Sequence, residues 1–177
     1  MKTGIFYGST YGNTQEIGEN LREIWGAFTG EKPEIFDVHS VETSQILDFD
    51  VILVGVSTWN DGQIQDDWDD RYRELDGFDF GGKIVALFGC GDQVAYSQTF
   101  VDALGIVGEK LAQRGATLVG KWPTEGYDFV FSKADLGDGF FIGLPLDPDN
   151  QGEQTTERLA NWAAQVVNET SLVGVGV

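Results

Sequence analysis

The chain has 177 residues, of which 41% are hydrophobic and 12% aromatic, enough for one domain with a sizeable core. Its 11 basic and 29 acidic residues give a net charge of −18, which argues against nucleic acid as a partner because the phosphates would be repelled. One cysteine and one histidine argue against a disulfide, a metal site or a catalytic triad, and no apolar run approaches the ~20 residues of a membrane span.

The chain opens on an apolar run that predicts a β-strand, and four more such runs follow. Two of them, "VILVGV" and "IVALFG", are almost continuously apolar, which is typical of parallel strands buried on both faces. Between the runs, apolar residues recur at helical spacing, and a shorter helix is expected over about 65–75. The predicted strands cover 3–7, 34–38, 51–56, 84–88 and 117–119, and the longer helical patterns cover 17–25, 101–111 and 159–167.

This alternation predicts an α/β fold, in which a doubly wound five-stranded parallel sheet of order 2-1-3-4-5 lies between two layers of helices. The segment 122–139, "WPTEGYDFVFSKADLGDG", breaks the alternation and indicates an insertion within or after the last strand. We expect a single domain over 1–170 and a flexible, glycine-broken tail over 171–177.

The loop after the first strand, "GSTYGNT", has the position of a phosphate site because it joins a strand to a helix. It is neither a Walker A loop nor a dinucleotide fingerprint, and it contains no Lys or Arg. Its neutral donors are the Asn13 amide, three hydroxyl groups and the free N–H groups at the helix start. Gly12 lets a ligand come close to the backbone at this point. These hydroxyl groups belong to Ser9, Thr10 and Thr14. The alternative is an ordinary strand-to-helix turn with Thr14 as the N-cap residue.

The loops after the third and fourth strands each carry an aromatic residue. Trp59 in "STWNDG" is either a stacking platform for a flat ligand or, as is commoner for Trp, packed on its own domain. Tyr96 in "GCGDQVAYSQ" is either a second aromatic beside the ligand or a half-buried residue that seals a helix start. Because the three loops meet at one sheet edge, together they predict a site for a planar, phosphorylated cofactor.

The sequence resembles the flavodoxins, specifically their long-chain branch, over almost its whole length. The resemblance rests on "GIFYGSTYGNT", "STWNDGQIQDDW", "KIVALFGCGDQVAYSQTF", "WPTEGYDF" and "GLPLDPDNQ". Each motif alone is weak, but the set is highly specific. The resemblance implies the flavodoxin-like form of the doubly wound sheet, with the segment 122–139 as the long-chain insertion.

The resemblance implies a non-covalent FMN whose phosphate lies in the loop 9–14 and whose isoalloxazine ring lies between Trp59 and Tyr96. It places the Asn60–Asp61 peptide beside flavin N5 and Gly91–Asp92 at the pyrimidine edge. The expected cofactor-binding residues are Ser9, Thr10, Tyr11, Gly12, Asn13, Thr14, Ser57, Thr58, Trp59, Asn60, Asp61, Gly62, Cys90, Gly91, Asp92, Tyr96, Gln98 and Asp149.

One position, Asp149, matches a family acid, and two positions, Tyr11 and Cys90, depart from the family pattern. Asp149 resembles the family's acid near the ribityl chain. Tyr11 stands where the family usually has Thr, so a hydroxyl contact is either lost or replaced by a backbone N–H. Cys90 stands where the family often has a small residue or Thr, and its thiol is either filler or a group that modulates the flavin. We expect His39 to be a surface residue without a role.

The implied function is a low-potential one-electron carrier, not an enzyme with its own substrate, whose FMN cycles between semiquinone and hydroquinone. The alternative is a flavodoxin-like NAD(P)H:quinone or FMN reductase, which needs a pocket over the flavin that Trp59 and Tyr96 would fill. A signalling module resembling response regulators is less suited, because the first strand ends in "FYGS" without an acid pair.

Acidic residues gather on or just before the helix expected after the Trp59 loop, and they bear on the choice of partners. They form either a solvated helix face or an acidic rim that steers basic redox proteins, and the two interpretations are compatible. We expect partners with basic docking surfaces, such as a ferredoxin/flavodoxin–NADP reductase or another low-potential oxidoreductase, and no membrane. We expect a monomer in the cytoplasm, since one cysteine fits a reducing compartment and strand-like sequence from Thr3 leaves no room for a signal peptide. The acids are Asp66, Asp67, Asp69, Asp70 and Glu74.

Overall fold

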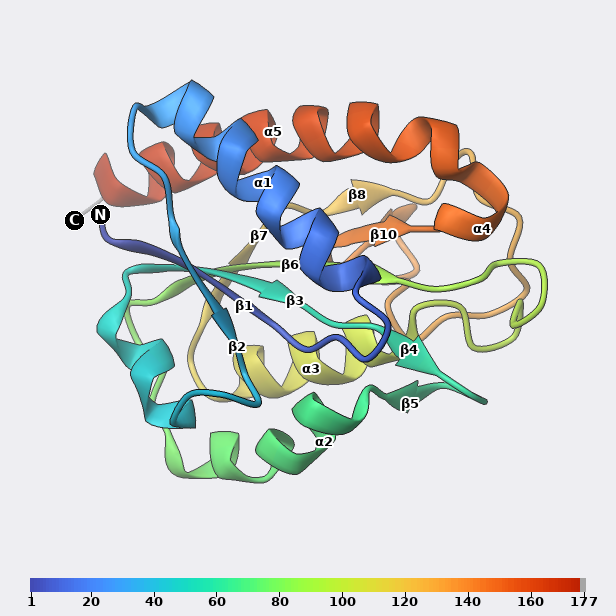
Figure 1. Cartoon of the computed structure of the whole chain (residues 1–177), viewed down its shortest axis with the longest axis horizontal. Coiled ribbons are helices and arrows are strands. Elements are labelled where there is room, and N and C mark those ends of the chain that lie inside the picture. Colours follow the sequence, from blue (N-terminus) through green and yellow to red (C-terminus); the bar gives the residue numbers. More distant parts are fainter. Residues whose placement is uncertain (176–177) are drawn as a thin grey trace.

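A computed structural model describes residues 1–175 of the chain, and its centre is a parallel six-stranded sheet (Figure 1). The strands follow the order β2-β1-β3-β6, and both β7 and β10 pair with β6. This confirms the predicted order 2-1-3-4-5, with β7 and β10 together in the fifth place. The strands are β1 (Thr3–Tyr7), β2 (Glu34–Asp37), β3 (Val51–Gly55), β6 (Ile84–Cys90), β7 (Thr117–Val119) and β10 (Leu144–Leu146).

The last position of the sheet is divided between two short strands. β7 pairs with β6 over Ile84–Ala86, and β10 pairs with it over Phe88–Cys90. The chain between them, residues 120–143, is the inserted segment, and it holds the small antiparallel pair β8 (Trp122–Pro123) and β9 (Phe140–Phe141). The predicted insertion therefore lies within the last strand.

Helices cover both faces of the sheet, as Figure 1 shows. On one face lie α1 (Asn13–Thr29) and α5 (Thr155–Val175), and on the other lie α2 (Asp66–Tyr72) and α3 (Asp102–Gln113). Each layer has its own core, because neighbouring residues of the fully buried strand β3 point to opposite faces. Burial on both faces explains the continuous apolar runs of the central strands.

The inserted segment is held to the domain by an aromatic cluster. The ring of Phe141 lies 5.3 Å from Tyr127 and 5.1 Å from Phe129, and all three contact Phe100. The Tyr127 hydroxyl donates to the Pro145 carbonyl at 2.7 Å. Burial raises the pKa of Tyr127, so this hydroxyl keeps its proton at neutral pH.

Short elements complete the chain. A hairpin of β4 (Thr58–Trp59) and β5 (Gln63–Ile64) precedes α2, and α4 (Pro148–Gln151) follows β10. The helix expected over 65–75 ends at Tyr72 and is followed by a 3₁₀ turn, η2 (Glu74–Gly77), which places Leu75 in the core. The other 3₁₀ turns are η1 (Thr43–Asp48) and η3 (Gly152–Gln154).

The end of the chain is helical as far as the structure describes it. The first residues of the segment 171–177 continue α5, and residues 176–177 lie outside the described part. A flexible tail there stays a prediction. Within residues 1–175, no helix combines the length and the apolar character needed to cross a bilayer.

Candidate functional site

A cleft of about 340 Å³ opens at the carboxyl ends of β1, β3 and β6, where ligands of open α/β sheets bind. Most of the residues predicted for the cofactor line it, and Pro148, which was not predicted, lines it too. No Lys, Arg or His is among its described lining residues, whereas two carboxylates are. The lining residues are Ser9, Thr10, Tyr11, Asn13, Thr14, Ser57, Thr58, Trp59, Asn60, Cys90, Gly91, Asp92, Tyr96, Pro148 and Asp149.

The first loop ends in an uncapped helix. Gly12 is the N-cap residue of α1, with a left-handed φ of 92°, and no described side chain caps the helix. Thr14 is therefore not the N-cap: it is buried, and its Oγ1 lies 2.5 Å from Ser57 Oγ, which ties this loop to the loop after β3. The first N–H groups of α1 are left without helical partners, and the positive end of its dipole favours an anion there.

The aromatic residues of the cleft are at least partly exposed. Trp59 is half-buried, and Tyr96 is 46% exposed, so neither is sealed in the domain core. Tyr11 stacks on Trp59, with ring centroids 5.3 Å apart and an angle of 18° between the planes. The residue that departs from the family pattern thus adds a third aromatic ring to the cleft, beside Trp59.

The third loop is shaped by two aspartates and an asparagine. The buried carboxylate of Asp147 accepts hydrogen bonds from Gln93 and from Asn150, and the Asn150 amide also donates to Asp92 at 2.8 Å. Partial burial opposes ionisation of Asp92, but hydrogen bonds from Ala95 N–H, the Asn150 amide and Val94 N–H together lower its pKa. Asp92 therefore brings a fixed negative charge to the cleft.

Sequence reasoning missed the supports Asp147, Gln93 and Asn150. The Asp147-Pro148 pair is a helix-start signal, and Asp147 is indeed the N-cap residue of α4 with Pro148 in its first turn. Gln93 has no such signal.

Cys90 is buried beside the Thr14 and Ser57 hydroxyl groups. Burial raises the pKa of its thiol to about 12, and the nearby charges of Asp147 and Asp149 act in the same direction. The thiol is protonated at neutral pH and lacks the thiolate character of a reactive cysteine. This supports the interpretation of Cys90 as packing.

Four predicted site residues do not line the cleft. Gly12 turns the first loop into α1 as its left-handed N-cap residue, and Asp61 is exposed in the β4–β5 turn. Gly62 has a φ of 89° and packs against α3, where an added Cβ would lie 2.7 Å from Asp102 Oδ2. Gln98 is exposed beyond Tyr96.

A second cleft, of about 410 Å³, lies at the amino ends of the strands. Its two lysines are already paired: Lys2 Nζ lies 3.2 Å from Glu34 Oε1, and Lys32 Nζ lies 2.6 Å from Glu23 Oε2. Since ligands of such sheets bind at the carboxyl ends, the smaller cleft is the candidate site.

Comparisons with known proteins point to a single family. The family model described as Flavodoxin matches residues 5–162. A flavodoxin from Nostoc sp. is 44% identical over 171 residues, covering 97% of this chain and 98% of the relative. Flavodoxin 1 from Escherichia coli is 44% identical over 173 residues, covering 96% of this chain and 95% of the relative.

Among solved structures, a Fusobacterium nucleatum flavodoxin bound to flavin mononucleotide superposes with a TM-score of 0.87 at 28% identity. The match covers 96% of this chain and 99% of that one. The family model, the relatives and the structure match nearly the whole chain, and the inserted segment at 120–143 is the one expected of the long-chain branch. The chain belongs to the flavodoxin family.

Proposed function

We propose that this protein is a low-potential one-electron carrier that binds FMN non-covalently in the cleft at the carboxyl ends of the strands. The observation that carries the proposal is an anion site without cations, at the uncapped start of α1, next to exposed aromatic rings. FMN supplies reversible one-electron chemistry when bound, and the protein supplies its place and its electrostatic surroundings.

The first loop fits a phosphate group. The hydroxyl groups of Ser9 and Thr10, one of the two hydroxyls of the Thr14–Ser57 pair, and the free N–H groups of α1 can donate, and hydrogen bonds to a charged acceptor are stronger than neutral ones. These donors are neutral, so the phosphate would keep its negative charge inside the site.

The aromatic rings fit a flat isoalloxazine. We assign Trp59 and Tyr96 to its two faces, the Asn60–Asp61 peptide to N5, Gly91–Asp92 to its pyrimidine edge, and Asp149 to the ribityl chain. Gly12, Gly62 and Gln98 then act indirectly, since they lie outside the cleft lining.

The charge of the site favours a low potential. A carboxylate ~10 Å from an added electron costs roughly 1.7 kcal/mol at an effective dielectric constant of ~20, which lowers a one-electron potential by roughly 70 mV. Hydrogen bonds lower the pKa of Asp92, so its carboxylate is ionised at neutral pH, and the phosphate adds further negative charge. These charges disfavour the negative charge that full reduction places on the flavin, and this lowers the potential.

A reductive titration tests the proposal. We expect the apoprotein to bind one FMN and, under anaerobic stepwise reduction, to pass from yellow through blue to colourless, because single electrons are added one after the other. Direct bleaching together with steady oxidation of NADPH by the protein alone would instead establish the reductase. A protein that gains no flavin spectrum from added FMN would contradict the site itself.

We propose that the partners are redox proteins with basic surfaces, which dock on an acidic face beside the cleft. Asp66, Asp69 and Asp70 are exposed and share one side of α2, and among residues 1–175 no cation lies within 4 Å of them. Asp67 and Glu74, by contrast, pair with His39 and Arg71. The three free carboxylates can attract a partner over a Debye length.

Electron transfer to cytochrome c, used as a basic probe protein, tests this surface. Replacing Asp66, Asp69 and Asp70 with Asn is expected to lower the association rate about 3- to 10-fold at low ionic strength, and the difference should vanish in 0.5 M salt. The control variant replaces three other exposed acids, Glu31, Asp48 and Glu109, with the corresponding amides, so its net charge changes by the same amount. Equal losses in both variants would mean that only net charge matters.

We also propose that the protein works as a monomer in the cytoplasm. Its single, unpaired thiol supports a reducing compartment. Sedimentation of the FMN-bound protein tests the monomer, since a dimer would have twice the chain mass of 19.4 kDa.

A further inference from the structure

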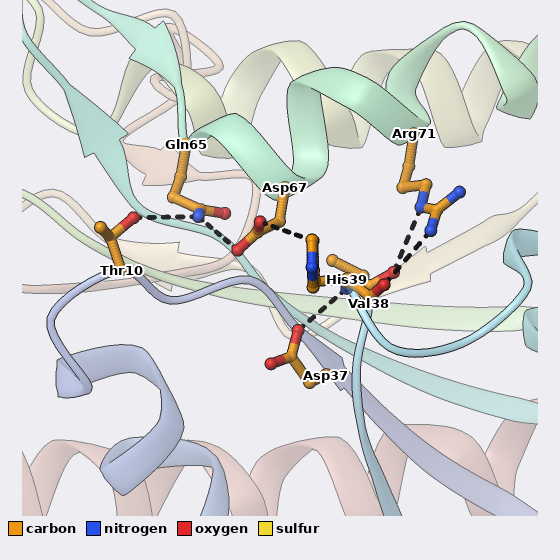
Figure 2. Close-up of polar contacts among 7 residues, drawn as sticks. All are labelled: Thr10, Asp37, Val38, His39, Gln65, Asp67 and Arg71. Carbon is orange, nitrogen blue, oxygen red and sulfur yellow. Dashed lines mark hydrogen bonds and ion pairs between the residues drawn. The ribbon is translucent and has the colours of Figure 1, made fainter.

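Gln65 is a buried amide between the first loop and α2. It immediately precedes α2 (Figure 2), and the residue is buried, with 1% of its surface exposed. Its Nε2 donates to Thr10 Oγ1 at 3.1 Å and to Asp67 Oδ2 at 2.7 Å. Both protons of the amide are therefore used, one on each side.

The surroundings fix the orientation of this amide. The carboxylate of Asp67 only accepts hydrogen bonds, so a flipped amide would set Gln65 Oε1 against it. Gln65 Oε1 instead lies over Gly8, where an added Cβ would be 2.2 Å away, and it has no hydrogen-bond partner among the described residues. Only glycine at position 8 leaves room for the observed orientation.

Asp67 is itself held in place from the other side. Its Oδ1 pairs with Nδ1 of His39 (Figure 2), and the two atoms are 3.4 Å apart. The backbone of His39 is anchored in turn, since its N–H donates to Asp37 Oδ1 at 2.9 Å and its carbonyl accepts from Arg71. The histidine expected to have no role thus supports the carboxylate that orients Gln65.

This arrangement decides where the Thr10 hydroxyl proton points. A hydroxyl has one proton to donate, and Thr10 Oγ1 already accepts from Gln65. Among residues 1–175, Thr10 donates to no protein acceptor, and it is exposed in the lining of the cleft. Its proton is therefore free for a ligand on the cleft side.

We propose that Gln65 is a positioning residue for phosphate recognition: by donating to Thr10 Oγ1, it commits the Thr10 hydroxyl to donate to the phosphate of FMN. The inference rests on the proposed FMN site. It assigns a function to a residue outside the cleft lining and separates phosphate recognition from ring recognition.

Dissociation constants for FMN and for riboflavin, which lacks the phosphate, test the role of Gln65. In Gln65→Met, which keeps the side-chain length but removes the donor, FMN binding is expected to weaken about 3- to 10-fold, the value of one neutral hydrogen bond. Riboflavin binding should not change. Gln65→Glu, which would accept the Thr10 proton, should lose at least as much FMN affinity and serves if Gln65→Met does not fold.

Two controls separate this role from a structural one. Gln165→Met removes a similar amide, which donates to Lys121 O and Glu169 Oε1 away from the cleft, and should leave both affinities unchanged. In a Thr10→Val background, Gln65→Met should have no further effect on FMN. Equal losses for FMN and riboflavin, or a full effect in the Thr10→Val background, would overturn the inference. A wild-type protein that binds both ligands equally would instead refute the phosphate site.

Discussion

Replacing Trp59 with alanine is expected to weaken FMN binding by about 10- to 100-fold, the range measured when an aromatic stacking platform is removed from a flat ligand. Riboflavin should lose the same factor, because the indole contacts the ring and not the phosphate. The variant should keep its fold, since the hairpin has other anchors: Thr58 Oγ1 accepts from Ala103 N–H at 3.0 Å, and Gly62 packs on α3. Fluorescence titration of the apoprotein with each flavin measures the effect.

The control for this prediction is Phe28→Ala. Phe28 is an aromatic residue on α1 that is 52% exposed and outside the cleft, so its loss should leave both affinities unchanged. Trp59→Phe should restore most of the binding, because a ring is kept. If Trp59→Ala lowered the affinity for FMN but not for riboflavin, Trp59 would belong to the phosphate site and the assignment to the ring would be wrong.

The sequence predicts the scaffold well where the pattern is set by burial. The central strands are buried on both faces, and their continuous apolar runs mark them without further information. The ligand edge follows from topology, because the loops after parallel strands must meet at one end of the sheet. For this reason the sequence predicts that the loops carrying Ser9, Trp59 and Gly91 form one site, and the cleft joins all three.

The sequence predicts less well where the structure depends on contacts between distant residues. Gln65 and Thr10 are 55 positions apart, and Gln93 and Asp147 are 54 apart, so no local pattern marks either pair. The strand β10 has only three residues, one of them proline, and it exists because β6 offers the second half of its edge. Helix α1 starts at Asn13 because Gly12 adopts a left-handed conformation, which the sequence permits but does not require.

The Asn60–Asp61 peptide lies in a strained turn beside the cleft, and we expect it to control the flavin potentials. Asn60 has a φ of 45°, a conformation that Asn tolerates better than most residues, and its Nδ2 donates to Gln63 Oε1 at 2.9 Å. We expect the Asn60 carbonyl to turn toward flavin N5 when N5 carries a proton, and to accept a hydrogen bond there. This peptide must be free to rotate for the contact to form.

Replacing Asp61 with proline removes that freedom. Proline forces the preceding residue toward extended conformations, away from the observed φ of Asn60, and it lacks an N–H. A hydrogen bond worth about 1–1.5 kcal/mol forms with the protonated N5 once the first electron has been added and stays after the second, so its loss lowers the first potential by about 40–65 mV. Spectroelectrochemistry should therefore find a first one-electron potential that is about 40–65 mV lower in Asp61→Pro than in a variant that loses only the charge.

Asp61→Asn separates the peptide from its charge. This variant removes the carboxylate but keeps the rotation. The first electron arrives with the proton on N5 and adds no net charge, whereas the second leaves the flavin anionic, so Asp61→Asn should raise the second potential and leave the first nearly unchanged. Asp61→Pro removes the same carboxylate and also the rotation, so the difference in first potential between the two variants reports on the peptide. If Asp61→Pro and Asp61→Asn had the same first potential, the Asn60 carbonyl would have no part in one-electron chemistry, and the acidic surroundings alone would have to account for the carrier's potentials.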